Sequence, residues 1–397
     1  MSLVERVKEL EDEFIGYRRQ IHQNPELGFE EFETTKLVEK VLHECGIETR
    51  PNGDKTGVIG LLKGGKPGKV IGLRADMDAL KLTEDTGLPF ASKKPGVCHA
   101  CGHDFHVATL LGAARILSEY KDQLCGTVKF LFQPAEEVMN GSDTMIANGA
   151  LENPKIDYLI AAHTWPEMPA GSVGVRKGAI LGSADRFTLT ITGKGGHAAH
   201  PHKCIDPVVI AAHVITQLQT IVSRNVAPVD SVVITVGHLT AGTVSNIIPT
   251  ECVMEGTVRT LNPDTRKMVK ENIERIAKCT AEGMGGCASL DYEWGVPPTL
   301  NEPFIIDNIS EAVVELLGED KLLEVPVPSM GAEDFARYLE FVPGVFFRLG
   351  TADERAETKG ALHSPKTLFN EKAIGTGVVA MVGTVFKLTG SDMSVLK

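Results

Sequence analysis

Apolar positions recur with two different periods along the first part of the chain. Groups spaced three or four positions apart predict helices, the first ending before Asn24-Pro25 and the second before Gly46. These helices are predicted over residues 3–22, 31–45 and 104–120. Strands are predicted over residues 57–64, 69–76, 126–132 and 156–162, and the last two are nearly continuous apolar runs, as expected of strands covered on both faces. This part of the chain is therefore predicted to be α/β.

The pattern changes near Gly182 and predicts a different order of elements. The apolar spacing predicts, in order, a strand at 185–193, a helix at 206–223, strands at 231–239 and 251–260, a helix at 263–283 and a strand at 288–294. The order βαββαβ is the ferredoxin-like pattern, so this stretch is predicted to form a self-contained α+β unit.

Alternation of helices and strands resumes after the segment PPTLNEP. Helices are predicted near 304–317, 332–340 and 370–388, and a strand near 344–349. The chain is therefore predicted to fold as two domains. One is a discontinuous α/β domain with a mixed sheet flanked by helices, residues 1–181 and 296–397. The other is an inserted α+β domain, residues 182–295.

The charge balance of the 397 residues excludes some classes of partner. Asp and Glu total 52 against 40 Lys and Arg, a formal net charge of −12. Such an acidic surface repels phosphate backbones, so no nucleic-acid partner is expected. The first residues, MSLVERVKELEDEF, lack the apolar core of a signal peptide, and no run approaches the roughly 18 apolar residues of a membrane span. We therefore expect a soluble cytoplasmic protein with no membrane partner.

Potential metal ligands are concentrated in the segment CHACGHDFH. It contains two of the eight cysteines, Cys98 and Cys101, and three of the twelve histidines, His99, His103 and His106. Thiolate and imidazole donors at such spacing favour zinc or a similar transition metal. Two alternatives remain open at this point: a redox pair formed by Cys98 and Cys101, and a structural zinc knuckle.

Polar residues follow three of the predicted strands at the point where each strand ends. Asp76 and Asp78 follow KVIGLRA, Glu136 and Glu137 follow GTVKFLFQPA, and His163 follows IDYLIAA. In open α/β sheets, ligands bind outside the carboxyl ends of the strands, so these side chains are expected at one edge. The paired glutamates suit metal-assisted hydrolysis, in which one carboxylate binds metal and the other acts as general base on a metal-bound water. Two solvated loop glutamates are the alternative.

Two further histidines stand in loop-like sequence outside these strands. His197 lies in GGHAAHPH, where the preceding glycines permit close approach of the backbone, and His363 lies in ALHSP. Both are candidates for the site, and simple exposure to solvent is the alternative for each.

Nine short motifs occur in order along the chain, and together they resemble the M20 metallopeptidase and amidohydrolase group. They are RADMDAL, CHACGHDFH, FQPAEE, AAHTWPEMPAG, GGHAAHP, SNIIP, GTVRT, GAEDF and LHSP. The chain is most similar to the branch of hippurate hydrolases, N-acyl-L-amino acid amidohydrolases and auxin-conjugate hydrolases. The resemblance extends from RRQIHQNPELGFEEFET to the last predicted helix. It implies a catalytic metal-binding domain interrupted by a domain that serves as lid and dimerisation surface.

The resemblance implies two divalent metal ions in each subunit. The positions that match the branch's metal ligands are Cys101, His103, Glu137, His163 and His363. Glu136 matches its general base. Asp76 and Asp78 match the positions at which the wider group has a metal-ligand histidine and its supporting aspartate, so they are expected beside the ligands, and Cys101 is expected to supply the missing ligand. The mixed donors favour Zn²⁺ or Mn²⁺, with Ni²⁺ and Co²⁺ as alternatives.

Three residues of the insertion also match positions near the active site of that branch. His197 and Asn246 match residues that reach an active site, commonly across a dimer interface, and Arg259 matches a residue near the substrate carboxylate. The resemblance thus implies that His197 stabilises the oxyanion and that Asn246 and Arg259 bind substrate. It also implies a homodimer or a dimer of dimers.

The expected activity is metal-dependent hydrolysis of the amide bond of an N-acyl amino acid, such as an acetyl or benzoyl derivative. The products would be a carboxylate and a free amino acid. Two alternatives remain open. A dipeptidase or an aminobenzoyl-glutamate-type hydrolase would use the same residues with a different acyl pocket. A thiol-rich metal-binding protein without activity would have no need for Glu136, which binds no metal in this scheme.

Overall fold

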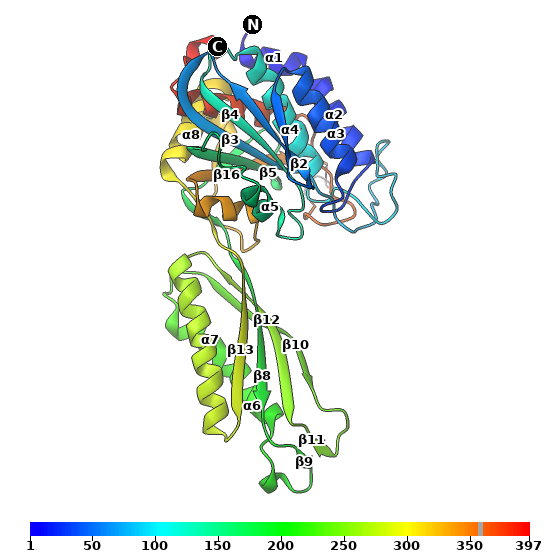
Figure 1. The fold of residues 1–397 in the computed structure, drawn as a ribbon, viewed down its shortest axis with the longest axis vertical. Helices are drawn as coiled ribbons and strands as arrows, with labels where there is room; N and C mark the ends of the chain where they lie inside the picture. Colours follow the sequence, from blue (N-terminus) through cyan, green and yellow to red (C-terminus); the bar gives the residue numbers. More distant parts are fainter. Residues whose placement is uncertain (356–359) are drawn as a thin grey trace. The chain divides into compact units, whose positions relative to one another are not determined.

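The computed structural model describes residues 1–355 and 360–397, which form two compact units (Figure 1). The first unit consists of Met1–Gly178, Leu300–Val327 and Asp334–Lys397, and the second of Ala179–Thr299 and Pro328–Glu333. The predicted α/β class, with a separate small antiparallel sheet, is confirmed. Among the described residues, no helix is both long and apolar enough to cross a membrane.

An eight-stranded mixed sheet organises the first unit. In sheet order its strands are β1 (Glu48–Asn52), β2 (Lys55–Lys63), β4 (Cys125–Gln133), β3 (Lys66–Asp76), β5 (Tyr158–Pro169), β16 (Gly344–Ala352), β6 (Val173–Val175) and β15 (Leu322–Glu324). β1, β2 and β4 pair antiparallel. The four middle strands, β4, β3, β5 and β16, are parallel. Parallel strands end at the same edge of a sheet, so the carboxyl ends of these four strands lie together.

The helices of the first unit pack their apolar faces against this sheet and against one another. They are α1 (Leu3–Glu9), α2 (Glu11–Gln23), α3 (Phe32–Glu44), α4 (His103–Glu119), α5 (Gly141–Ala147), α8 (Pro303–Leu317) and α9 (Ala373–Thr389), with 3₁₀ turns η3 (Glu319–Lys321), η4 (Asp334–Glu340) and η6 (Met393–Leu396). α4 and α9 contact each other and β3, and Leu110, Leu111 and Val378 are fully buried there. This core fixes the helix that begins at His103.

The structure corrects two of the predicted helices. The helix predicted over residues 3–22 is interrupted at Leu10, because the three acidic residues after it favour the amino-terminus of a new helix. The helix predicted over 332–340 is the 3₁₀ turn η4, whose first residue, Asp334, is held by buried polar groups. The short elements β1, β6, β15 and α5 were not predicted, since they contain too few apolar residues to show a period.

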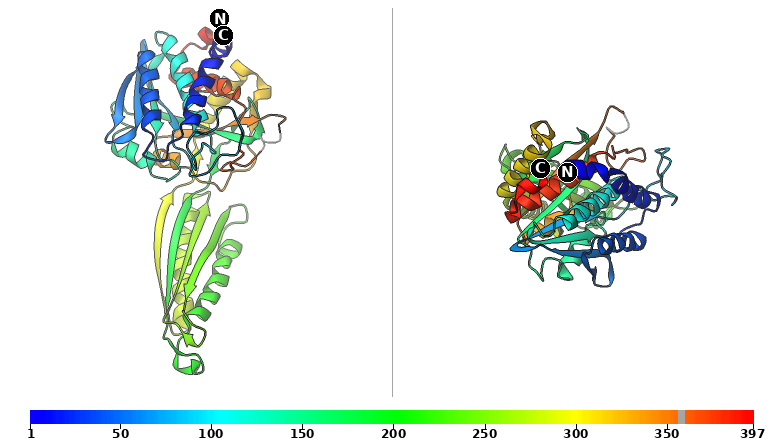
Figure 2. Two further views of the ribbon diagram at one scale, coloured as in Figure 1. Left: turned by 90° about the vertical axis from the view of Figure 1, so that its right-hand side faces the viewer. Right: turned by 90° about the horizontal axis from the view of Figure 1, so that it is seen from above.

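A four-stranded antiparallel sheet with two helices packed together against it forms the second unit (Figure 2). In chain order its elements are β8 (Ala184–Thr192), α6 (Pro207–Thr220), β10 (Val232–Ala241), β12 (Glu251–Thr260), α7 (Pro263–Gly283) and β13 (Cys287–Val296). The sheet order is β10-β12-β8-β13, so the predicted βαββαβ arrangement is confirmed. Leu189, Ile210 and Met254 are among the apolar residues of its core.

Several short elements lie outside the two main sheets. A 3₁₀ turn, η1 (Pro201–Lys203), follows β9 (Gly196–His197), and β9 pairs antiparallel with β11 (Ile247–Ile248) in the second unit. A π-helical turn, η2 (Ile221–Asn225), continues α6. β7 (Gly178–Leu181) and β14 (Thr299–Asn301) lie where the chain passes between the units. The segment Pro328–Glu333, which lies outside the predicted insertion, groups with the second unit, and the separate roles assigned to the two domains stay predictions.

Candidate active site

The strands β3, β4 and β5 and the loops that follow β3 and β4 bring five of the candidate residues together in the first unit. Asp76 is the last residue of β3, Glu136 and Glu137 follow β4, and His163 lies in β5. The carboxylate of Asp78 accepts hydrogen bonds from the backbone N–H groups of Glu136 and Glu137, at 3.0 Å each. The loop after β3 therefore holds the turn after β4.

Helix α4 and a late loop add three more donors at the same place. Gly102, with a φ of 90°, adopts the left-handed conformation that favours glycine, so that Cys101 precedes the helix and His103 begins it. Sγ of Cys101 lies 3.4 Å from Nε2 of His163 and 3.3 Å from Nε2 of His363. The N–H of His363 donates to the carbonyl of the residue before Cys101 at 3.0 Å, which fixes the ALHSP loop beside α4.

Cys101 belongs to two groups of donors, each compact enough to share a metal ion. One group joins Cys101 to His103 and His163, the other joins it to Glu137 and His363, and within each group the donor atoms lie within 4.8 Å of one another. Nε2 of His363 is 3.5 Å from Oε1 of Glu137. Donors on one tetrahedral zinc ion lie roughly 3.4–3.6 Å apart, as follows from Zn–S and Zn–N bond lengths. The structure thus brings the five predicted ligands together in two overlapping groups, and their role as metal ligands stays a prediction.

Buried donor atoms without hydrogen bonds are a second indication of a cation. Within residues 1–355 and 360–397, Nε2 of His103 and Oε1 of Glu137 are buried and make no hydrogen bond. Such atoms are rarely left unpaired, because each costs about 1–3 kcal/mol. Burial also raises the pKa of the Cys101 thiol well above its usual value, so a thiolate there needs a cation beside it. The residues present therefore fit a divalent transition metal.

Outer hydrogen bonds orient the two buried histidines. Nδ1 of His103 lies 3.2 Å from Oδ1 of Asp78, and Nδ1 of His163 lies 2.7 Å from the carbonyl oxygen of Thr164. Because both oxygens are acceptors, each Nδ1 donates its proton to one of them, and Nε2 is the ring nitrogen that remains to bind a cation. This is the tautomer in which a neutral imidazole binds a metal ion through Nε2.

Residues 72–387 match the model of peptidase family M20/M25/M40. The chain belongs to this family. It is 43% identical to the N-acetyl-L-cysteine deacetylase of Bacillus subtilis (strain 168), over 92% of this chain and 85% of that one. It is 40% identical to the hippurate hydrolase of Campylobacter jejuni, over 94% and 96% of the two chains. The crystal structure of the Bacillus subtilis YXEP protein, a dinuclear metal binding M20 peptidase, matches with a TM-score of 0.86 and 35% identity, over 97% and 100%.

The resemblance predicted from the nine motifs is therefore confirmed. The chain is a metal-dependent M20 amidohydrolase of the aminoacylase and hippurate hydrolase type. The alternative of a redox pair finds no support, since Cys98 and Cys101 are both buried thiols. Burial raises the pKa of Cys98 to about 11, whereas redox-active thiols have lowered values.

His106 takes part in the site of this M20 enzyme, although the sequence pattern assigned it no role. Its Nδ1 lies 2.6 Å from Oδ1 of Asp76, and its Nε2 accepts the backbone N–H of Thr164 at 2.9 Å. Arg74 donates to the other oxygen of Asp76 at 2.7 Å. Burial opposes ionisation of Asp76, but His103, Arg74 and His106 hold its pKa well below the usual range. The available signal was the spacing of three residues from His103, which places both imidazoles on one side of α4.

A glutamate distant in sequence holds the turn that carries Glu136 in the M20 enzyme. Ala135 has a φ of 56°, a left-handed conformation that is uncommon for alanine, and its N–H donates to Oε1 of Glu31 at 2.8 Å. The other carboxylate oxygen of Glu31 accepts the hydroxyl of Thr56 at 2.5 Å. Burial raises the pKa of Glu31 to about 7. Glu31 and Asp78 together bind three successive backbone N–H groups of this turn, and the sequence pattern did not identify Glu31.

The GAEDF motif places Asp334 in a buried polar network behind Glu136. The carboxylate of Asp334 accepts a hydrogen bond from the guanidinium of Arg74 at 2.9 Å. It also accepts two hydrogen bonds from the side-chain amide of Gln133, at 2.7 and 2.9 Å. Its backbone N–H donates to Oε1 of Glu136 at 3.4 Å. The network therefore connects β3, β4 and η4 to the candidate general base. The GAEDF motif is part of the family resemblance, but the resemblance implies no role for Asp334.

The residues predicted to act from the insertion lie in the second unit. The β9–β11 pair places His197 opposite Ile247, and the N–H of Ala198 donates to the carbonyl of Asn246 at 3.1 Å. The structure thus makes His197 and Asn246 neighbours on an exposed ribbon. Arg259 lies in β12, where partial burial lowers its pKa. The roles of these three residues toward the metal ligands stay predictions.

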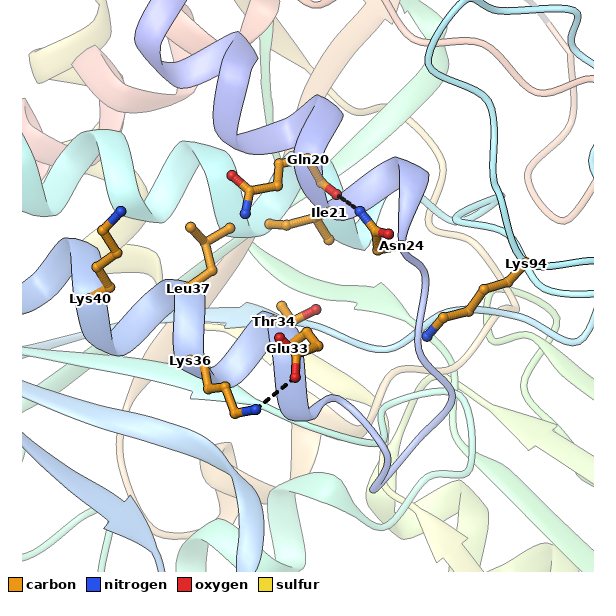
Figure 3. Close-up of a pocket in the computed structure, with 9 residues that line it drawn as sticks. All are labelled: Gln20, Ile21, Asn24, Glu33, Thr34, Lys36, Leu37, Lys40 and Lys94. Atoms are coloured by element: carbon orange, nitrogen blue, oxygen red, sulfur yellow. Dashed lines mark hydrogen bonds and ion pairs between the residues drawn. The ribbon is translucent and has the colours of Figure 1, made fainter.

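A surface cavity of about 420 Å³ lies elsewhere in the first unit (Figure 3). Residues of α2 and α3 line it, together with Lys94 from the loop before α4. Glu33 and Lys36 form an ion pair of 2.7 Å at its wall. None of the candidate catalytic or metal-binding residues lines this cavity, so the candidate site rests on the geometry of its donors.

Proposed function

We propose that this M20 enzyme hydrolyses the amide bond of an N-acyl amino acid, with an acetyl, benzoyl or similar acyl group, to a carboxylate and a free amino acid. The observation that carries the proposal is that Cys101 is shared by two donor groups, one of whose members, His103, also lies in a compact group with the buried carboxylate of Glu136. The relatives named for N-acetyl-L-cysteine deacetylation and for hippurate hydrolysis support an N-acyl amino acid as substrate.

Two divalent metal ions would be held by Cys101, His103, Glu137, His163 and His363. We propose Zn²⁺ or Mn²⁺, with Ni²⁺ and Co²⁺ as alternatives, because the donors combine sulfur, nitrogen and oxygen. Bound metal ions supply Lewis-acid activation of the attacking water and of the scissile carbonyl. Asp78 and the carbonyl of Thr164 keep the two buried imidazoles in the metal-binding tautomer.

Glu136 is the proposed general base. Its side chain is buried, its N–H is held by Asp78, and its Oε1 accepts the N–H of Asp334. The carboxylate takes a proton from the attacking water as the new C–O bond forms. It then delivers this proton to the amide nitrogen as the C–N bond breaks, so that the amino acid leaves as an amine. The water oxygen remains in the released acid, which becomes a carboxylate when the second water-derived proton passes to the amine.

The purified protein should hydrolyse N-acyl amino acids only in the presence of a divalent metal. Release of free amine is measured for N-acetyl, N-benzoyl, long-chain and indole-acyl amino acids, together with dipeptides and aminobenzoyl-glutamate. A chelator should abolish activity, and Zn²⁺, Mn²⁺, Ni²⁺ or Co²⁺ added singly should restore it. Faster turnover of dipeptides or aminobenzoyl-glutamate would replace the proposed substrate class. Metal binding without turnover of any compound would contradict the proposed function.

We also propose that the second unit, about residues 182–295, pairs two subunits and closes over the substrate. β10 is an edge strand of its sheet, with Val233 and Leu239 exposed, and Val208 and Val209 are exposed on α6. An exposed edge strand with apolar side chains suits antiparallel pairing with a second copy across a two-fold axis. Asn246 and Arg259 are the proposed substrate contacts of this unit, and closure would exclude water from the reaction.

Replacing His197 by alanine should lower kcat by about 10²–10³-fold, because its proposed contact to the oxyanion forms in the transition state. Metal content and thermal stability should not change, since His197 is exposed in the second unit. His200→Ala is the matched control: its ring lies 5.4 Å from that of His197, and its loss should leave kcat unchanged.

If His197 acts across a dimer, mixing His197→Ala with Glu136→Gln subunits should restore part of the activity. Each mixed dimer would contain one site in which both residues are intact. Subunit exchange is verified by mass spectrometry of differently tagged chains. No recovery after verified exchange would mean that His197 acts within its own chain or has no catalytic role.

A further inference from the structure

Arg348 is a buried cation, two of whose three donor nitrogens make no hydrogen bond among the described residues. Its side chain is 7% exposed, and within the described residues its Nε and Nη2 make no hydrogen bond. Burial lowers the pKa of Arg348 to about 10, so the guanidinium still carries its charge at neutral pH. Glu167 is the carboxylate that most favours this charge, but it is exposed and does not hydrogen-bond to those two nitrogens. Buried charges are normally paired or bind a ligand, because an unpaired one is costly.

Arg348 lies one strand away from a proposed metal ligand. In the parallel pairing of β16 with β5, Arg348 stands opposite His163, so both side chains project from the same face of the sheet. Phe346, two residues before Arg348 and on the same face, has its ring 5.8 Å from that of His163. Ligands of open α/β sheets bind at the carboxyl ends of the strands, and His163 and Arg348 lie level with the carboxyl ends of β3 and β4.

The indole ring of Trp165 packs against the guanidinium of Arg348. Cζ of Arg348 lies 3.7 Å from the ring centroid of Trp165, and the rings of Trp165 and His163 are 6.4 Å apart. Stacking uses the face of the guanidinium and leaves the N–H groups on its edge free to donate. Such an edge matches the two oxygens of a carboxylate, which it binds in a bidentate manner.

We propose that Arg348 binds a carboxylate group of the substrate. This inference rests on the proposed function, since every N-acyl amino acid carries an α-carboxylate two bonds from the amide nitrogen that is cleaved. The same chemistry would bind a second carboxylate on the side chain of an acidic amino acid. Arg259, the other arginine proposed to bind substrate, lies in the second unit, whereas Arg348 lies in the first. A substitution of Arg348 therefore leaves Arg259 unchanged.

Binding of three matched ligands to metal-loaded Glu136→Gln enzyme tests the proposal without turnover. The ligands are N-acetylglutamate, N-acetylglutamine and the α-amide of N-acetylglutamine, and calorimetry gives each Kd. If Arg348 holds the α-carboxylate, adding Arg348→Gln should raise the Kd of N-acetylglutamate and of N-acetylglutamine by about 10–100-fold. The Kd of the α-amide should not change. If it holds a side-chain carboxylate, only N-acetylglutamate should be weakened.

Two further variants separate binding from packing. Arg348→Lys keeps the positive charge and should retain part of the preference for ligands that carry the carboxylate. If thermal melting shows that Arg348→Gln does not fold, the same three Kd values are measured with Arg348→Lys. Arg50→Gln is the matched control, because the guanidinium of Arg50 is already bound by the carbonyls of Asn148 and Gly149. It should change none of the three Kd values.

Equal weakening of all three ligands, or no change in any, would overturn the assignment of Arg348 and leave it as a packing residue on Trp165. Absence of binding by all three before Arg348 is changed would instead count against the proposed function, and the Arg348 proposal would fall with it. The two failures are therefore distinguished by the behaviour of the Glu136→Gln parent.

Discussion

Replacing Glu136 by glutamine should reduce kcat by about 10²–10⁴-fold or more while leaving the bound metal unchanged. The amide has the shape of the carboxylate but does not take up a proton from water. The turn should keep its position, because Glu31 and Asp78 bind it through its backbone N–H groups. These hydrogen bonds do not involve the side chain of Glu136. Steady-state kinetics and metal analysis of the purified variant measure the two quantities.

Glu137→Gln is the matched control for this prediction. Its carboxylate is a proposed ligand, with Oε1 3.5 Å from Nε2 of His363, so this variant should lose metal together with activity. The two variants would then differ in metal content, although both would hydrolyse the substrate slowly. If Glu136→Gln lost its metal and Glu137→Gln kept it, the two roles would have to be exchanged.

Loss of the Cys101 sulfur should remove metal from both proposed positions and abolish activity. Cys101 belongs to both donor groups, so Cys101→Ala takes one ligand from each. The fall in metal affinity should exceed the roughly 10–100-fold that follows the loss of an outer hydrogen-bond partner. In the unchanged protein, metal should shield the thiolate from alkylation, and chelation should make Cys101 reactive toward iodoacetamide. Peptide mass spectrometry measures the labelled fraction.

Two other cysteines, Cys98 and Cys279, serve as internal controls for the alkylation experiment. Cys98 is as buried as Cys101, and burial raises its pKa to about 11, so it should react slowly with or without metal. Cys279 is exposed and should be labelled in both states. Labelling of Cys101 to the same extent before and after chelation would contradict its role as a metal-bound thiolate.

The edge of the sheet that carries the site was predictable because two local signals coincide there. The apolar runs of β3, β4 and β5 mark buried strands. Asp76 ends β3 and Glu136 follows β4, while His163 lies within β5, level with the carboxyl end of β3. Parallel strands align these ends whatever the rest of the fold does. The order of elements in the second unit was predictable for a similar reason, since alternating and helical apolar spacing both report on nearby burial.

The supporting residues were not predictable in this way. Glu31 binds the N–H of Ala135, and Asp334 binds Arg74, across separations of more than a hundred residues. In the sequence, nothing distinguishes Glu31, Asp334 or Arg74 from a charged residue on the protein surface. The positions are buried only because distant segments cover them after folding, and a polar side chain buried by distant segments leaves no period in its own neighbourhood.

The sequence by itself determined the fold class, the βαββαβ order of the second unit and, through its motifs, the membership of the M20 family. Only the tertiary structure decided that Cys101 is common to two donor groups, that His106 joins Asp76 to the backbone of Thr164, and that Arg348 lies beside His163 without a hydrogen bond to its Nε or Nη2 among the described residues. The physical reason is that periodicity and strand ends record local burial. Which donors meet depends instead on the three-dimensional path of segments that are far apart in the chain.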